Sequence, residues 1–256
     1  MASVRNILAL NDPDPKEMSV VDHLDELRGR LIVCVAVITV GSILGWFVSL
    51  GVFDLLARPL HPYLAKASDP LGTRFVFNSI TDPFTLKLKL SIAVGVALAL
   101  PVLLYQGWMF VAPAISVNAR RHVVPFVLVG IALFLVGATV GYNVFPLVVR
   151  FLVGQKNGFT GTEILAQISG YVSQFVLVLV VFGAVFEMPV VLTFLALIGV
   201  VSSRFLRARR KGAAMIGLIA AMVITPGADP VTPFVTAAIV YLLYESSIIA
   251  IRLMHR

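Results

Sequence analysis

LIVCVAVITVGSILGWFVSLGVF, residues 31–53 of the chain, contains no charged side chain. An α-helix rises about 1.5 Å per residue, so a stretch of this length is sufficient to cross the hydrocarbon core of a bilayer, which is about 30 Å thick. The whole chain is similarly apolar: 59% of its 256 residues are hydrophobic, 13% are charged, and the mean hydropathy is +0.98. A soluble domain contains about 45–50% apolar and about 25% charged residues. The sequence therefore predicts an integral membrane protein.

The composition also excludes other classes of protein. Disordered chains, collagen-like fibres and disulfide scaffolds do not have this apolar content, and the single cysteine, Cys34, cannot form an internal disulfide. The net charge of +7 would suggest a nucleic-acid partner for a soluble protein. Here the charge has a simpler explanation, because the cytoplasmic loops of membrane proteins collect Lys and Arg. No basic surface interleaved with aromatic residues is evident either, so we expect no nucleic-acid partner.

Six apolar tracts predict six membrane spans within a single membrane domain that covers residues 1–256. The fold class that we predict is all-α, with transmembrane helices at about 31–50, 87–107, 123–146, 169–198, 212–226 and 233–251. The last two tracts are separated by residues 225–230, TPGADP, because Pro and Gly interrupt helices. We expect the fifth and sixth spans to be short: residues 212–225 would give only about 21 Å of helix. The alternative is that the boundary of the fifth span is misplaced by a few residues.

The distribution of basic residues predicts the orientation of these spans. An even number of spans places both termini on one side, and 13 of the 20 Lys and Arg residues lie on that side, including five within residues 204–211, RFLRARRK. Because cytoplasmic loops are enriched in Lys and Arg, we expect both termini in the cytoplasm. The segment before the first tract is acidic, which is opposite to the charge of a signal-peptide n-region.

Two segments outside the spans have predicted structures. We expect residues 1–30 to form a cytoplasmic arm and residues 54–83 to form an extracytoplasmic cap. The cap should begin with a short amphipathic helix from Phe53 that ends at Pro59 and Pro62 and lies on the outer surface.

We find in the sequence none of the motifs that are typical of metalloenzymes, serine hydrolases or ATPases. The four histidines are scattered over loops and ends, and we find no HExxH, GxSxG or GxxxxGK[ST] motif. We therefore expect no catalytic site, no metal site, no cofactor and no hydrolysis of ATP by this chain.

One acidic residue lies deep within the fourth predicted span. Glu187 precedes Pro189 in the sequence FGAVFEMP, and an ionisable group at membrane depth is costly and so suggests a function. Pro189 lacks a backbone donor and should open the helix beside the carboxylate. The alternative is a protonated Glu187 that is satisfied by a neighbouring helix and has only structural value. Glu245 lies nearer the cytoplasmic end of the sixth span, where snorkelling or helix pairing explains it equally well.

The end of the N-terminal arm has an acidic face. Asp22, Asp25 and Glu26 share one side of a predicted helix because they are three and four residues apart, and Leu24, Leu27 and Leu31 share another. One interpretation is a carboxylate surface that binds the guanidinium groups of a basic peptide. The other is a solvated face that Arg28 and Arg30 balance locally.

Several motifs, in order along the chain, resemble the TatC family of the twin-arginine protein translocase. Residues 23–31, HLDELRGRL, are similar to its HLxELRxRL signature, and residues 104–113, LYQGWMFVAP, followed by Arg120 and Arg121, resemble its first cytoplasmic loop. The segments FEMP at 186–189, TPGAD at 225–229 and LYE at 243–245 resemble its fourth span, its turn between the fifth and sixth spans, and its sixth span. The resemblance covers about residues 18–252.

The resemblance implies a receptor in the cell inner (cytoplasmic) membrane for folded cargo that carries a twin-arginine signal peptide. It implies single-span partners, TatA and TatB, self-association within the receptor complex, contact with membrane lipid, and transport driven by the protonmotive force. It also implies two sites. By resemblance, Glu26 and its neighbours in the arm, with Phe110, Arg120 and Arg121, form the signal-peptide site, and Met222 and Thr225 match positions linked to the docking of partner helices. From the residues themselves we add Asp22, Asp25 and Arg28 to the first site, and Glu187, Pro189, Asp229 and Glu245 to the intramembrane site.

The chain departs from the family pattern in three places. Ala119 stands where the family usually has a Glu that helps to hold the signal arginines. The turn after the fifth span is longer by one residue, and Thr232 or Pro233 replaces a Gln that is usual near the start of the sixth span. We expect Asp22 or Asp25 to supply the charge that Ala119 lacks. A proton-coupled small-solute transporter using Glu187 and a non-transporting membrane scaffold remain the alternatives.

Overall fold

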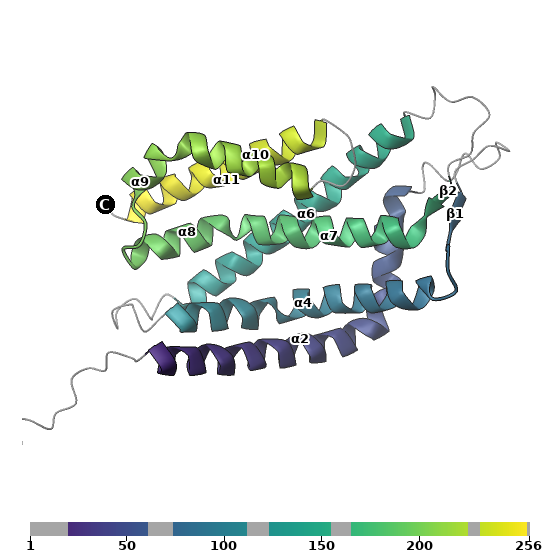
Figure 1. The fold of residues 1–256 in the computed structure, drawn as a ribbon, viewed down its shortest axis with the longest axis horizontal. Helices are drawn as coiled ribbons and strands as arrows, with labels where there is room; N and C mark the ends of the chain where they lie inside the picture. The colour runs from purple at the N-terminus through teal and green to yellow at the C-terminus, as the bar shows by residue number, and fades with distance from the viewer. Residues whose placement is uncertain (1–19, 61–73, 112–122, 155–164, 225–230, 255–256) are drawn as a thin grey trace, which may run out of the picture.

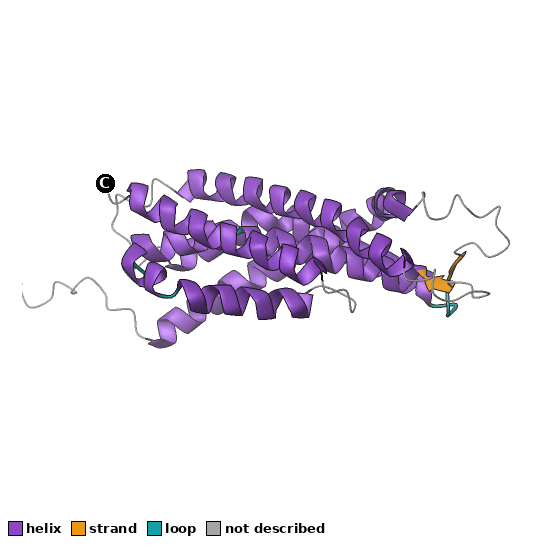
Figure 2. Ribbon diagram, turned by 90° about the horizontal axis from the view of Figure 1, so that it is seen from above, coloured by secondary structure: helices purple, strands orange, loops and turns teal. Residues whose placement is uncertain are grey.

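The computed structural model describes residues 20–60, 74–111, 123–154, 165–224 and 231–254. Within these residues the fold is a bundle of helices that run along one long axis, with two very short strands at one end (Figure 1 and Figure 2). An all-α fold is what the apolar tracts predict, and the two strands are an addition that no sequence pattern indicated.

The first helix, α2 (Val20–Ala57), joins the predicted arm, the first apolar tract and the start of the predicted cap in one element. A 3-10 turn, η2 (Arg58–Leu60), follows it and contains Pro59. Figure 1 shows that the last part of α2 turns and runs across the bundle. The helix that we predicted to begin at Phe53 is therefore not a separate element but the bent end of α2. This helix ends at Ala57, two residues before Pro59.

Helix α4 (Asp82–Val111) packs along α2 over most of its length. Glycines make this close approach possible: a Cβ atom on Gly41 would lie 2.9 Å from the carbonyl oxygen of Gly95, closer than side chains tolerate. Gly41 and Gly45 form a GxxxG motif on α2, and such motifs let two membrane helices pack backbone against backbone. This motif is visible in the sequence, but it was not among the features from which we predicted the fold.

Helix α6 (Val123–Gly154) packs in the same way against α7 (Ile168–Phe186). A Cβ atom on Gly137 would lie 2.6 Å from the carbonyl oxygen of Phe182. A second GxxxG motif, Gly137 and Gly141, therefore forms this crossing.

An aromatic core lies beside the bent end of α2. The rings of Phe145 and Phe175 stack with their centroids 4.4 Å apart, and Tyr142 stacks on Phe175 at 5.4 Å. The buried members of this core are Leu56, Leu86, Leu90, Val144, Phe145, Val172, Phe175, Val178, Phe182 and Phe186. Offset aromatic pairs add to the stabilisation that burial alone gives.

Tyrosine hydroxyls fasten the bent end of α2 to the core. Tyr142 donates a hydrogen bond to the carbonyl oxygen of Leu55 at 3.0 Å, and Tyr171 donates one to that of Leu56 at 3.3 Å. The last carbonyls of a helix have no partner within the helix, so these bonds satisfy groups that would otherwise be unpaired.

Two three-residue strands close this end of the bundle. Strand β1 (Arg74–Val76) pairs in parallel with β2 (Leu165–Gln167). Asp82, at the start of α4, accepts hydrogen bonds from the amide of Asn78 at 3.0 Å and from the side chain of Gln167 at 3.2 Å. This carboxylate therefore ties the start of α4 to the segment that leads into α7.

Helix α8 (Met188–Leu197) continues the direction of α7 after a break at Glu187. A short helix, α9 (Ser203–Ala208), then leads to α10 (Arg210–Ile224) and α11 (Val231–Met254). The side chain of Ser202 caps α9 by accepting a hydrogen bond from the amide of Phe205 at 3.1 Å.

Five helical segments in the described part of the chain are long and apolar enough to cross a membrane, namely 23–57, 82–110, 124–151, 168–197 and 232–254. Helix α10 has 15 residues, or about 22 Å, which agrees with the prediction of a short fifth helix. The prediction of a short sixth helix was wrong, because α11 has 24 residues, or about 36 Å. Figure 1 shows that α10 and the start of α11 nevertheless stop before the far ends of α6 and α7.

Candidate functional site

The first predicted site lies where α2 begins. Asp25 and Arg28 are exposed there, while the side chain of Glu26 is 22% exposed. Asp22 belongs to α2, and its side chain lies outside the described part of the structure, as do Ala119, Arg120 and Arg121.

One carboxylate oxygen of Glu26 is already occupied. Arg30, one helical turn later, donates a hydrogen bond from Nε to Oε1 of Glu26 at 3.1 Å, and its Nη2 also contacts this oxygen. The third nitrogen, Nη1, donates to Oε1 of Gln106 on α4 at 3.0 Å. The guanidinium group therefore connects α2 to α4 through Glu26 and Gln106.

The second oxygen of Glu26 is buried and has no hydrogen-bond partner within the described part of the chain. Nδ1 of His23 lies 3.8 Å from it, which is longer than a hydrogen bond. The His23 ring stacks on Phe110, with centroids 4.3 Å apart and planes 14° from parallel. A carboxylate oxygen beside an aromatic pair is an arrangement suited to a guanidinium group.

The structure therefore brings two of the predicted signal-peptide residues together. Glu26 and Phe110 come from different helices and are linked through His23. Gln106 was not predicted as a site residue, although it lies in the quoted motif LYQGWMFVAP and is the last amide side chain of α4.

The second predicted site contains Glu187, at the junction of α7 and α8. Glu187 is the C-cap of α7 and the N-cap of α8. Its amide donates to the carbonyl of Ala184 at 3.1 Å, three residues earlier, whereas a regular α-helix would use the carbonyl of Gly183. Pro189 stands in the first turn of α8. The break predicted from Pro189 is therefore present where the carboxylate lies.

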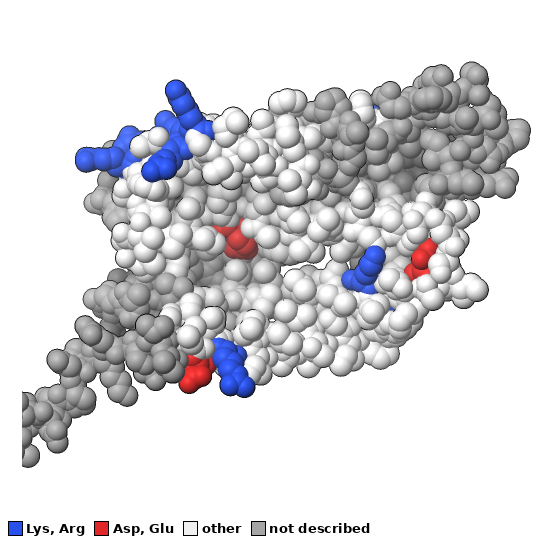
Figure 3. All heavy atoms as spheres, viewed as in Figure 1, with Lys and Arg blue, Asp and Glu red and all other residues white. Residues whose placement is uncertain are grey.

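Glu187 is only 9% exposed, and neither of its carboxylate oxygens has a hydrogen-bond partner within the described residues. An acidic patch in the middle of the face in Figure 3 lies over the junction of α7 and α8, with few other charges near it. A buried polar group without a partner carries an energetic cost that native structures usually avoid. Such a group is therefore a candidate for contact with a molecule that the structure does not contain.

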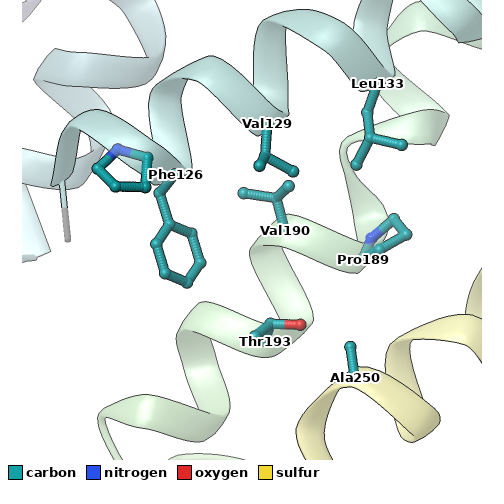
Figure 4. A pocket seen from close by; sticks show the side chains of 8 residues that line it. Phe126, Val129, Leu133, Pro189, Val190, Thr193 and Ala250 are labelled. Carbon is teal, nitrogen blue, oxygen red and sulfur yellow. The ribbon is translucent and has the colours of Figure 1, made fainter. Parts of the chain in front are cut away.

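Beside the break lies an apolar pocket of about 260 Å³ between α6, α8 and α11. Figure 4 shows Pro189 and Val190 facing Val129 and Leu133 across it, and Thr193 is the polar residue that points into it. Pro189, which follows the break, is therefore one wall of this pocket.

The remaining intramembrane candidates do not gather around Glu187. Met222 is 55% exposed near the end of α10, and Thr225 and Asp229 lie outside the described residues. Glu245 on α11 accepts a hydrogen bond from Nη2 of Arg210 at 2.6 Å. This ion pair joins α11 to the start of α10, which agrees with the helix-pairing interpretation of Glu245.

The long apolar helices define a multi-pass membrane protein, with a polar site at one end of the bundle and an isolated carboxylate at the junction of α7 and α8. Within the described residues, no group of three His, Cys, Asp or Glu side chains is close enough to hold a metal ion.

Comparison with known proteins identifies the family. A family model described as Sec-independent protein translocase protein (TatC) matches residues 22–238. The Sec-independent protein translocase protein TatC of Desulforapulum autotrophicum is 37% identical over 90% of this chain and 83% of its own length, and that of Koribacter versatilis is 35% identical over 94% and 87%. A crystal structure described as the twin arginine translocase receptor TatC is 35% identical, with a TM-score of 0.76 over 91% of this chain and all of the solved one.

The chain belongs to the TatC family of Sec-independent protein translocase proteins. It is therefore a component of a protein translocase, and a transport protein rather than an enzyme.

Proposed function

We propose that this chain is the receptor subunit that binds the twin-arginine signal peptides of folded proteins at the ends of α2 and α4. The observation that carries the proposal is the partly buried Glu26, whose Oε2 has no hydrogen-bond partner in the described structure and lies beside the stacked His23 and Phe110 rings. A guanidinium group offers a planar fork to a carboxylate, so this site suits arginine better than lysine. The family resemblance also assigns Arg120 and Arg121 to this site, and they follow α4 in the sequence.

A second carboxylate is needed for the second arginine, because a desolvated charge without a partner is costly. Asp25 is exposed on the same helical turn as Glu26, and Asp22 is one turn earlier on the same helix. We propose that one of these two residues supplies the charge that Ala119 does not.

We propose that six helices span the inner (cytoplasmic) membrane, with both termini in the cytoplasm. The five long apolar helices together with α10 supply the spans. The orientation is supported by Figure 1, where the start of α2 and the end of α11 lie at the same end of the bundle, and by Figure 3, where basic side chains gather over α9 to α11 at that end. Basic residues accumulate on the cytoplasmic side of membrane proteins.

The membrane-facing part would bind the single-span partners TatA and TatB, with copies of the receptor associating in one complex. Two features support this part of the proposal: the carboxylate of Glu187 lacks a partner among the described residues, and Met222 is exposed near the end of the short α10. A short span creates a mismatch with the bilayer that a neighbouring helix can relieve. Pro189, Thr225 and Asp229 would belong to this surface, and the protonmotive force would drive transport.

A binding experiment distinguishes this proposal from a small-solute transporter or a membrane scaffold. The purified full-length chain is incubated with an immobilised twin-arginine signal peptide and with the same peptide carrying two lysines. The proposal requires capture by the first peptide and much weaker capture by the second. Equal capture by both peptides, or by neither, would contradict it.

A further inference from the structure

The carboxylate that we propose for the signal arginine already holds an arginine of this chain. Arg30 donates through Nε and Nη2 to a single oxygen of Glu26, and through Nη1 to Gln106. The side chain of Arg30 is 20% exposed, so the whole contact is partly shielded from water. The group that occupies Glu26 in the empty protein thus has the same chemistry as the group that the peptide would bring.

We propose that Arg30 is a built-in competitor of the signal-peptide arginine, and that Gln106 is the positioning residue that receives Arg30 when the peptide displaces it. This inference rests on the proposed function of Glu26. To make a two-pronged contact with both oxygens of Glu26, an incoming guanidinium must take over Oε1, which Arg30 now contacts with two nitrogens. Peptide binding is therefore an exchange of one guanidinium for another.

The exchange lowers the affinity of the site for any peptide that must displace Arg30 from Glu26. An incoming arginine replaces the lost contacts with equivalent ones, because its fork has the same donors as Arg30. A lysine ammonium is a point charge and does not reproduce the fork, so it replaces a strong contact with a weaker one. Both peptides start from the same occupied site, so Arg30 lowers both affinities by the same factor, and the preference for arginine comes from the planar fork of the incoming group.

Gln106 lowers the cost of this exchange. Its Oε1 accepts from Nη1, a nitrogen that is not among those bonded to Glu26. Arg30 can therefore keep this bond when it leaves Glu26, and it does not become a buried charge without an acceptor. With a non-polar residue at position 106, Arg30 would have Glu26 as its one acceptor of these two, and the peptide would displace it less easily.

The test measures the affinities of the purified full-length chain for the twin-arginine peptide and its twin-lysine variant. The variants are Arg30→Gln, Arg30→Lys, Gln106→Leu, the double variant Arg30→Gln with Gln106→Leu, and Glu26→Gln. Arg252→Gln is the matched control, because it removes one exposed basic charge from α11, a helix that takes no part in the site, at the same end of the bundle. Gel filtration of each variant establishes that it is folded.

The proposal predicts that Arg30→Gln binds the twin-arginine peptide at least about fivefold more tightly than the wild type, that Arg30→Lys has a smaller effect in the same direction, and that Arg252→Gln binds like the wild type. Gln106→Leu should weaken binding of the twin-arginine peptide in the wild-type background and should have no effect when Arg30 is Gln.

Two results would overturn the proposal in different ways. If Arg30→Gln weakens the twin-arginine peptide as strongly as Glu26→Gln does, Arg30 orients Glu26 and does not compete with the peptide, while the proposed function stands. If Glu26→Gln binds both peptides like the wild type, Glu26 is not the signal-arginine site. In that case the proposed function of this site fails together with the competitor.

Discussion

The carboxylate of Glu187 lies against Gly130 of α6. A Cβ atom on Gly130 would come within 3.0 Å of Oε2 of Glu187 and within 2.7 Å of a methyl group of Leu104 on α4. Because Gly130 has no side chain, there is space for the carboxylate between α6, α4 and the junction of α7 with α8. The position of the acid depends on this glycine as much as on the break at Pro189.

Gly130→Ala is expected to move the Glu187 carboxylate without changing any charge. The added methyl group is closer to Oε2 than ordinary contacts permit, so Glu187 or Leu104 must shift. We expect export of a twin-arginine reporter to fall while the amount of receptor in the membrane stays near the wild-type level. Gly51→Ala is the matched control, because a Cβ atom on Gly51 would contact nothing within 4 Å. Equal export by the two variants would show that the carboxylate does not need its present position.

Glu187→Ala is expected to block export or assembly with partner helices, while the variant still inserts and binds the signal peptide at the far site. The reason is that the carboxylate has no partner within the described chain and is available to a polar group on an inserted helix. Co-purification with the single-span partners and export of the reporter are the measurements. Full export by Glu187→Ala would leave Glu187 with a structural role only.

A photo-cross-linker placed at Met222 is expected to capture a partner helix. Met222 is 55% exposed on a helix of about 22 Å, which is shorter than the hydrocarbon core, so a neighbouring helix should shelter this end. The same cross-linker at Leu253, which is 66% exposed at the C-terminal end of α11, serves as the control. Cross-links at Leu253 that equal those at Met222 would show that capture there reflects exposure to the membrane alone.

The acidic residues near Glu26 give a prediction about the missing loop carboxylate. We expect Asp22→Asn, Asp25→Asn, or the pair of changes to weaken binding of the twin-arginine peptide, and Ala119→Glu to restore it. The reason is that two guanidinium groups require more than one negative partner once they leave water. Peptide affinity measured across this cycle of variants is the readout. Normal binding by the Asn variants, or failure of Ala119→Glu to rescue them, would place the second charge elsewhere.

Much of the fold could be predicted because the bilayer imposes strong rules on the sequence. The long apolar tracts indicated the helices, the combination of Glu187 with Pro189 indicated the break between α7 and α8, and residues 225–230 separated α10 from α11. The short length of α10 was also predictable. The length of α11 was not, because its helix continues beyond the apolar tract to Met254, where polar and apolar residues mix.

The features that were missed depend on contacts between distant segments. The pairing of β1 with β2 joins residues about ninety positions apart, and neither three-residue strand has a recognisable pattern. The crossings at Gly41 and Gly137 were within reach, because both belong to GxxxG motifs, but their partner helices could not be named from the sequence. The contact of Arg30 with Gln106 likewise joins α2 to α4, and nothing local to either residue indicates it.

The affinity of the purified chain for a twin-arginine signal peptide, measured for wild type, Glu26→Gln and Asp54→Asn, decides whether the start of α2 is the receptor site. Asp54 is an exposed acid at the opposite end of the same helix, so its substitution removes a similar charge away from the site. Because charge-assisted hydrogen bonds are lost only in the first variant, we predict that Glu26→Gln weakens binding by about tenfold or more and that Asp54→Asn binds like the wild type. Equal affinity of Glu26→Gln and the wild type would contradict the assignment of Glu26 as the arginine-binding carboxylate.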